Sequence, residues 1–122
     1  MIERSMVVEA NKVAIQSVAE DRLDLPKIMP SLREMKNIVG DSTYRAKIHA
    51  RNQGLHKKTS AAYKFHRAQL NSHWDAVNHL EAAIKHASQH GRTEKSKKHY
   101  AIARKHLEKA AERDDKTNAR YY

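Results

Sequence analysis

The 122-residue chain contains no cysteine, three glycines, two prolines and one phenylalanine. Without cysteine, disulfides, thiolate catalysis and cysteine-rich zinc sites are excluded. No apolar run approaches the roughly 20 residues that a membrane span needs, so we expect no contact with a membrane. The opening residues include an acid at position 3 and no sustained apolar core, so we expect no secretory signal. These absences favour a cytoplasmic protein, or one within an intracellular or virion assembly.

Large apolar side chains are also scarce. Leu, Ile, Val and Phe together make up 21 of the 122 residues, and alanine alone contributes 17. Alanine favours helix but buries little area, and each buried methylene is worth only about 0.8 kcal/mol. We therefore expect ordered helices around a thin core, which a protein partner, a second copy of the chain or a nucleic acid would stabilise further.

The strongest pattern in the chain is helical. Residues 60–90 contain neither proline nor glycine, and two rows of side chains recur there at steps of seven, as expected for one face of a long α-helix. Gly91 ends this helix in a left-handed conformation, and Thr93 caps a last helix from Glu94 to about residue 114. The two rows are Tyr63, Leu70, Val77 and Ile84, and His66, His73, Leu80 and Ala87.

Shorter helices are predicted before this pair. The first spans residues 2–22 and is apolar on two sides, which indicates two neighbours or a subunit contact. A connector with two prolines follows at 23–30. A short helix at 31–39 ends at Gly40, and a third helix, capped by Asp41 or Ser42, runs to about residue 52.

The predicted fold is an all-α helical bundle in a single domain, residues 1–122. Its centre is an antiparallel helical hairpin at about 60–114, because so short a connection forces the two long helices to lie side by side. Two or three N-terminal helices pack against this hairpin, and residues 118–122 form a tail. The outline of short helix, glycine and basic helix at 31–53 also matches a helix-turn-helix.

The net charge of +10 is unevenly distributed. Residues 1–40 are neutral overall, whereas residues 41–122 hold 18 basic and 8 acidic side chains, so that the helices at 41–117 are strongly basic. Such an asymmetry indicates a polyanionic partner, most often nucleic acid, or an acidic protein surface. The alternative is a charge that serves only to keep a helical protein in solution.

Two groups of basic residues are candidate binding sites. One lies on the last helix, opposite Tyr100, where side chains in a row would neutralise phosphates without reading bases. The other lies between Tyr44 and Trp74, a stretch with no acidic residue. The first group is Lys95, Lys98, Lys105, Lys109 and Arg113, and the second includes Arg45, Lys47, Lys57, Lys58, Lys64 and Arg67.

Aromatic residues accompany the second basic group, as in proteins that bind single-stranded nucleic acid by stacking bases on aromatic rings. Tyr63 and Trp74 fall on or beside the apolar rows of the long helix, so we expect them in the core. Phe65 lies off those rows and is the predicted exposed aromatic.

Four pairs among the nine histidines are seven residues apart. His66 and His73 fall on the apolar face, where we expect them to be buried and hydrogen-bonded. The outer side of the same helix carries His79, His86 and His90, and His99 approaches from the facing helix. Clustered histidine adds positive charge below about pH 6.5 and strengthens anion binding.

His86 and His90, four residues apart on one helix, could form half of a metal site. No acid or cysteine stands at ligand spacing to complete it. We therefore expect neither a metal ion nor another cofactor.

Residues 51–56 read Arg-Asn-Gln-Gly-Leu-His. This stretch resembles the R-x4-H element of HEPN-type ribonucleases, which are small all-helical proteins, and Asn52 matches the asparagine that often follows the arginine in that family. The resemblance implies that Arg51 and His56 act on the scissile phosphate. Histidine would transfer the proton and arginine would stabilise the pentavalent phosphate.

We rank three functions on these observations. The first is a non-enzymatic basic helical protein that binds nucleic acid or another polyanion. The second is a structural or adaptor subunit of a larger assembly, such as a virion or secretion-type complex, with self-association or a protein partner. The third is a HEPN-like ribonuclease acting through Arg51 and His56.

Overall fold

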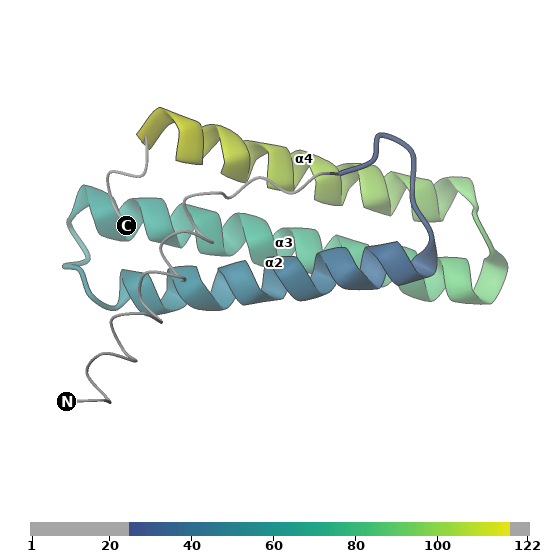
Figure 1. The fold of residues 1–122 in the computed structure, drawn as a ribbon, viewed down its shortest axis with the longest axis horizontal. Coiled ribbons are helices and arrows are strands. Elements are labelled where there is room, and N and C mark those ends of the chain that lie inside the picture. The colour runs from purple at the N-terminus through teal and green to yellow at the C-terminus, as the bar shows by residue number, and fades with distance from the viewer. Residues whose placement is uncertain (1–24, 118–122) are drawn as a thin grey trace, which may run out of the picture.

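The computed structural model describes residues 25–117, which form three α-helices: α2 (Leu32–Gln53), α3 (Ala61–His90) and α4 (Glu94–Thr117). Consecutive helices run antiparallel, and α2 and α4 each pack against α3 (Figure 1). The predicted all-α bundle is therefore confirmed for this part of the chain. The predicted first helix and the C-terminal tail lie outside the described residues. None of the three helices is long and apolar enough to cross a bilayer.

The ends of α3 and α4 lie close to their predicted positions because local capping groups define them. The Ser60 hydroxyl accepts a hydrogen bond from the Tyr63 N–H at 3.1 Å, and Gly91 ends α3 with a φ of 78°. At the start of α4, Thr93 and Ser96 cap each other. Thr93 Oγ1 accepts from the Ser96 N–H at 3.3 Å, and Ser96 Oγ accepts from the Thr93 N–H at 3.0 Å. α4 then continues three residues beyond the predicted end.

The predicted division of residues 31–52 into two helices is wrong. α2 runs unbroken through Gly40, and Ser31 caps it by accepting a hydrogen bond from the Glu34 N–H at 3.2 Å. A glycine inside a helix costs only about 1 kcal/mol relative to alanine. That cost is offset because an unbroken helix buries one continuous face, formed by Met35, Ser42, Ala46 and His49.

The helix-turn-helix outline at 31–53 is wrong for the same reason. Such a motif needs a turn between its two helices. Asp41 and Ser42 lie inside α2 instead of capping a new helix, and the Ser42 side chain is fully buried against α3.

The core is thin, as the composition predicted. The main cluster of buried residues contains three alanines, which let α4 approach α3 closely. Its largest fully buried apolar side chains are Tyr100, Met35 and Leu80. The buried residues of this main cluster are Met29, Met35, Ala76, Leu80, Ala83, Tyr100, Ala103 and Leu107.

The connector before α2 is tied to the turn between α3 and α4. The Tyr100 hydroxyl donates a hydrogen bond to the Pro26 carbonyl, and the Arg92 guanidinium donates to the carbonyls of Met29 and Pro30. Burial raises the pKa of Tyr100, so its hydroxyl stays protonated and remains a donor. These bonds hold the start of α2 beside the start of α4.

Candidate functional site

Four lysines of α4 form a ridge on the outer side of the bundle: Lys95, Lys98, Lys105 and Lys109, called the α4 ridge below. All four are exposed, on the side of α4 away from its buried stripe of Tyr100, Ala103 and Leu107. The ion pairs within α4 join Lys97 to Glu94 and Arg104 to Glu108. Among the described residues, no carboxylate lies within ion-pair distance of the α4 ridge, so these charges have no partner there.

Arg113, predicted on the same ridge, lies elsewhere. Its Nη1 donates to the Ala68 carbonyl at 3.3 Å and to Gln69 Oε1 at 3.4 Å, and it also reaches the Ser72 hydroxyl. Arg113 therefore joins α4 to α3. Its predicted solvent-facing position is wrong, because hydrogen-bond acceptors on α3 draw the guanidinium towards the helix interface.

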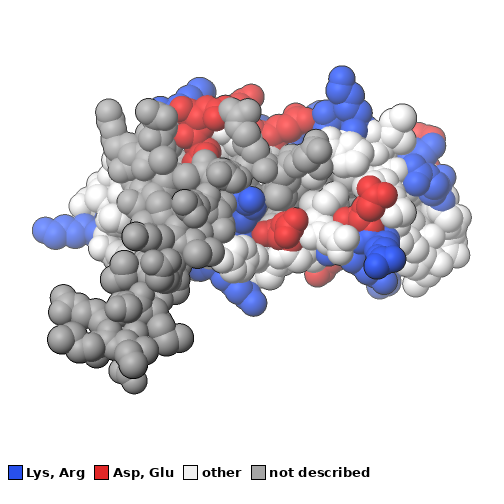
Figure 2. Space-filling view, viewed as in Figure 1, with Lys and Arg blue, Asp and Glu red and all other residues white. Residues whose placement is uncertain are grey.

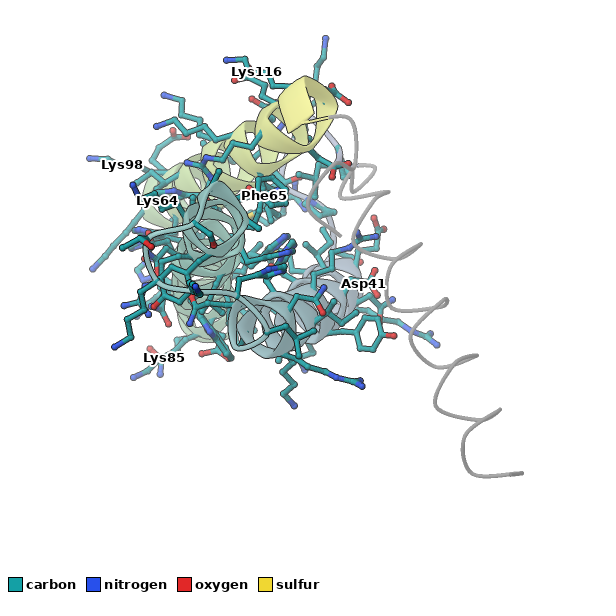
Figure 3. The ribbon with its side chains drawn as sticks, turned by 90° about the vertical axis from the view of Figure 1, so that its left-hand side faces the viewer. Asp41, Lys64, Phe65, Lys85, Lys98 and Lys116 are labelled. Carbon is teal, nitrogen blue, oxygen red and sulfur yellow. The ribbon has the colours of Figure 1, made fainter. Side chains whose placement is uncertain are left out.

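The outer side of α3 adds further positive charge next to the α4 ridge. Lys64, Arg67 and Lys85 are exposed there, although the acidic Asp75 and Glu81 are exposed on the same side of α3. In Figure 3, Lys64 and Lys85 project to the same side as Lys98, whereas Asp41 of α2 points to the opposite side. The opposite face, which Figure 2 shows, has acidic and basic side chains interspersed over its described residues. Acidic side chains are thus present on both sides of the bundle, and the row of lysines without acidic residues among them is the α4 ridge.

The remaining basic candidates are dispersed. Lys47 is exposed on α2, and Lys57 and Lys58 are exposed in the turn between α2 and α3. Arg45 is partly buried on α2. The structure thus does not gather the second basic group into one surface, although Lys64 and Arg67 lie on the α3 side just described.

Phe65 and Trp74 have the opposite exposure to the one predicted. Phe65 is only 7% exposed, and its ring contacts His49 and His66, whereas Trp74 is 40% exposed. Tyr63 is partly buried. Trp74 is therefore the aromatic side chain available on the outer side of α3. It lies seven residues after Arg67 and eleven before Lys85, so the three side chains share one face of the helix.

Three histidines form a buried group between α2 and α3. His49, His66 and His73 are fully buried, as predicted for His66 and His73. The Nδ1 atoms of His49 and His66 are 3.0 Å apart and form a hydrogen bond. One ring donates its N–H, and the accepting nitrogen of the other ring carries no proton. His73 stacks on His49 and shares a 3.1 Å hydrogen bond with the Ser42 hydroxyl. We call these three residues the buried histidine group.

A second set of histidines lies between the outer edges of α3 and α4: His79, His86, His90, His99 and His106, called the outer histidine row. The Nδ1 atoms of His79 and His99 are 3.3 Å apart, and the ring of His79 also stacks on His106 at 6.0 Å. The predicted approach of His99 to α3 is thus confirmed. His86 and His90 are in contact with ring centroids 4.8 Å apart.

The structure does not assemble a metal site at His86 and His90. Within residues 25–117, no group of three or more His, Asp or Glu side chains is arranged to hold a metal ion. Lysines flank the pair instead, as described below.

The ribonuclease-like element at residues 51–56 spans the end of α2. Arg51 is in the last turn, Gly54 follows the helix, and His56 lies in the turn beyond, with its ring stacked on buried His66 at a centroid distance of 5.7 Å. Both side chains are exposed. The element therefore spans the end of α2, and its role as a ribonuclease motif stays a prediction.

Sequence reasoning missed Trp74 and Lys85 as surface residues and His106 as a neighbour of His79. A signal for Lys85 was present, since it lies 18 residues, or five helical turns, after Arg67 on α3. For His106, the signal was its spacing of seven from His99.

No family model, no curated protein and no solved structure matches this chain. Over its described residues, the structure defines a small three-helix protein. It has a row of exposed lysines on α4, and histidines in contact with one another on both sides of its central helix.

Proposed function

We propose that the protein binds nucleic acid or a comparable polyanion through the α4 ridge and the adjoining outer side of α3. The observation that carries the proposal is the α4 ridge itself, four exposed lysines without a carboxylate partner among the described residues. Like charges on one helix face repel one another, so a negatively charged partner would relieve that repulsion.

The arrangement of the α4 ridge suits phosphates in a row. From Lys98 to Lys109 the helix rises about 16 Å at 1.5 Å per residue, which spans several phosphates of a nucleic-acid strand. Lysine acts on phosphate as a point charge and does not distinguish bases. Binding through this face would therefore be strongly salt-dependent and almost independent of sequence.

Trp74 supports a contribution from bases as well as phosphates. Its indole is the partly exposed aromatic on the outer side of α3, and stacking of a base on an aromatic ring is worth about 1–3 kcal/mol. Single strands, whose bases are free to stack, would then bind more tightly than duplexes of equal length. Because the chain has one tryptophan, its fluorescence also reports binding directly.

The test compares two variants of equal net charge. In the first, Lys98, Lys105 and Lys109 are replaced by glutamine. In the matched control, Lys27, Arg33 and Lys36, which are exposed on the connector and on α2, are replaced instead. Affinity for fluorescent DNA and RNA oligonucleotides is measured from low to high salt.

We expect the first variant to lower the slope of log K against log salt by about two to three, since each phosphate contact contributes about 0.9 for duplex DNA. The control should retain the wild-type slope. Equal losses in both variants would assign the binding to net charge alone, and no binding by the wild type at low salt would refute the proposal. Cleavage of the RNA, abolished by His56→Ala, would support the ribonuclease hypothesis instead.

A second candidate function is a subunit of a larger assembly. The observation in its favour is four large apolar side chains exposed in the isolated chain: Ile28, Tyr44, Leu55 and Trp74. This hypothesis predicts self-association in sedimentation experiments, weakened by Trp74→Ala and unaffected by the α4 ridge variant. A monomer at all concentrations, without a protein partner, would count against it.

A further inference from the structure

A pocket of about 380 Å³ lies between the end of α3 and the start of α4. Its polar lining comes from both helices: Lys85, His86, Gln89 and His90 on α3, and Lys95 and His99 on α4. Its volume falls near the lower end of the range of small-molecule sites, roughly 300–1,000 Å³.

The charges around the pocket are all positive or can become so. Each helix contributes one lysine, three imidazoles also line the pocket, and no carboxylate is among the lining residues. The nearby Glu94 directs its carboxylate to Lys97, 3.5 Å away. The lining of the pocket thus offers donors for an anion and contains no carboxylate.

The histidines respond to this positive environment. Partial burial lowers the pKa of His86 below its usual value, and neighbouring positive groups lower it further: His90, Lys95 and His99. Partial burial also lowers the pKa of His99, followed by the charges of His79, Lys95 and Lys98. An anion in the pocket would have the opposite effect, because it stabilises the protonated imidazoles.

A metal ion fits this pocket poorly. Lys85 and Lys95 would repel a cation, and the described residues offer no three-ligand group that includes His86 and His90. Lysine, imidazolium and an amide are instead the donors that bind phosphate and sulfate.

We infer that the pocket binds a phosphate-type oxyanion, either free or carried on a small molecule, and that binding strengthens as the pH falls. The ligand is a single oxyanion held by His86, His90 and His99 with the two lysines, distinct from a strand of phosphates along the α4 ridge. Lys95 belongs to both the pocket and the α4 ridge, so variants of Lys105 and Lys109, which lie outside the pocket, distinguish failure of this inference from failure of the proposed function.

The test uses sulfate as the first probe, because sulfate keeps its two negative charges over the working pH range, whereas a phosphate monoester gains a proton near pH 6. The imidazole Cε1–Hε1 resonances of the full chain are followed by NMR during sulfate titrations at about pH 7.5, 6.5 and 5.5.

We expect saturable shifts of the His86 and His99 resonances, with affinity increasing about tenfold per pH unit for each imidazole that takes up a proton on binding. Lys95→Gln should weaken binding at every pH. A His86→Gln/His99→Gln variant should lose the pH dependence of sulfate binding. His106→Gln, which changes a histidine of the outer row outside the pocket, should leave the affinity and its pH dependence unchanged. Circular dichroism checks that each variant is folded.

Two results would overturn the inference. One is the absence of saturable shifts at low pH. The other is equal shifts at His56 and His106, which would indicate general screening rather than a site. Inorganic phosphate and ribose 5-phosphate then separate the sources of the ligand: tighter binding of the ester means a phosphate on a larger molecule, and equal binding means a free oxyanion. The double variant Lys105→Gln/Lys109→Gln should retain sulfate binding even where oligonucleotide binding is lost.

Discussion

The buried histidine group and the outer histidine row lie on opposite sides of α3, and both contain imidazoles in direct contact. They differ in what the facing helix offers. α2 covers His66 and His73 with the Ser42 hydroxyl and the His49 ring, whereas α4 brings Lys95 beside His86 and leaves the pocket open to solvent. A spacing of seven residues thus places histidines on one face of a helix, and the partner helix determines whether they become structural or available to a ligand.

The largest expected difference between the two regions is in stability. His73→Ala should lower the free energy of unfolding by about 2–3 kcal/mol, because it leaves a cavity and removes the buried partner of Ser42. His106→Ala in the outer row should cost about 0.5 kcal/mol or less. Urea denaturation of both variants measures the two values. Similar losses would show that the buried histidine group contributes no more to stability than the outer histidine row.

A substitution in α2, the helix that covers the buried histidine group, should stabilise the protein. Gly40→Ala is expected to raise the free energy of unfolding by about 1 kcal/mol, because the position is inside an exposed helix surface with no atom within 4 Å of the added Cβ. The control is Gly91→Ala, which should destabilise the protein because its φ of 78° disfavours any side chain. Thermal denaturation distinguishes them, and a lower melting temperature for Gly40→Ala would contradict a continuous α2.

The hydroxyl of Ser42 should contribute less than the imidazole that it contacts. Ser42→Ala removes hydrogen bonds to His73 Nδ1 and to the His73 carbonyl, at a cost of about 1 kcal/mol. Ser88→Ala, which removes an exposed bond to the Ile84 carbonyl, should change stability by less than about 0.5 kcal/mol. Equal losses for the two variants in urea denaturation would show that the Ser42–His73 hydrogen bonds stabilise the fold no more than an exposed serine bond does.

The smallest effect concerns pH, and it belongs to the outer row. Because the pKa values of His86 and His99 are lower in the folded state than in the unfolded chain, the unfolded chain binds more protons near and below pH 6.5. Their contribution should therefore decrease stability as the pH falls through that range. His86→Gln/His99→Gln should flatten this decline in melting curves without added anion, and an unchanged profile would contradict the assignment.

The sequence predicted the hairpin well because its boundaries depend on neighbouring residues, such as Ser60, Gly91 and Thr93. It failed at Gly40, where packing against α3 outweighs a local preference to end the helix. The exchange of Phe65 and Trp74 has a different cause. Gln69, Ser72 and the alanines of α3 do not read as an apolar row, yet they form its contact with α4, so the buried side of α3 is wider than the pattern suggested.

The candidate site was predicted in part. The four lysines of the α4 ridge followed from the helical projection alone, since nothing in the described structure packs over them. Arg113 did not, because its position depends on acceptors on another helix, the Ala68 carbonyl and Ser72. The pocket between α3 and α4 required the register of the two helices, which residue spacing within one helix does not specify.

The order of the helices along the chain has a consequence for how the protein is made. The extensive contacts between helices join consecutive elements, α2 with α3 and α3 with α4. Helical bundles with such local contacts fold in microseconds to milliseconds. Translation is far slower than that, at about 5–20 residues per second. The pairing of α2 with α3 can therefore form on the ribosome before α4 has been synthesised, whereas the lysine-flanked pocket exists only once the last helix has emerged.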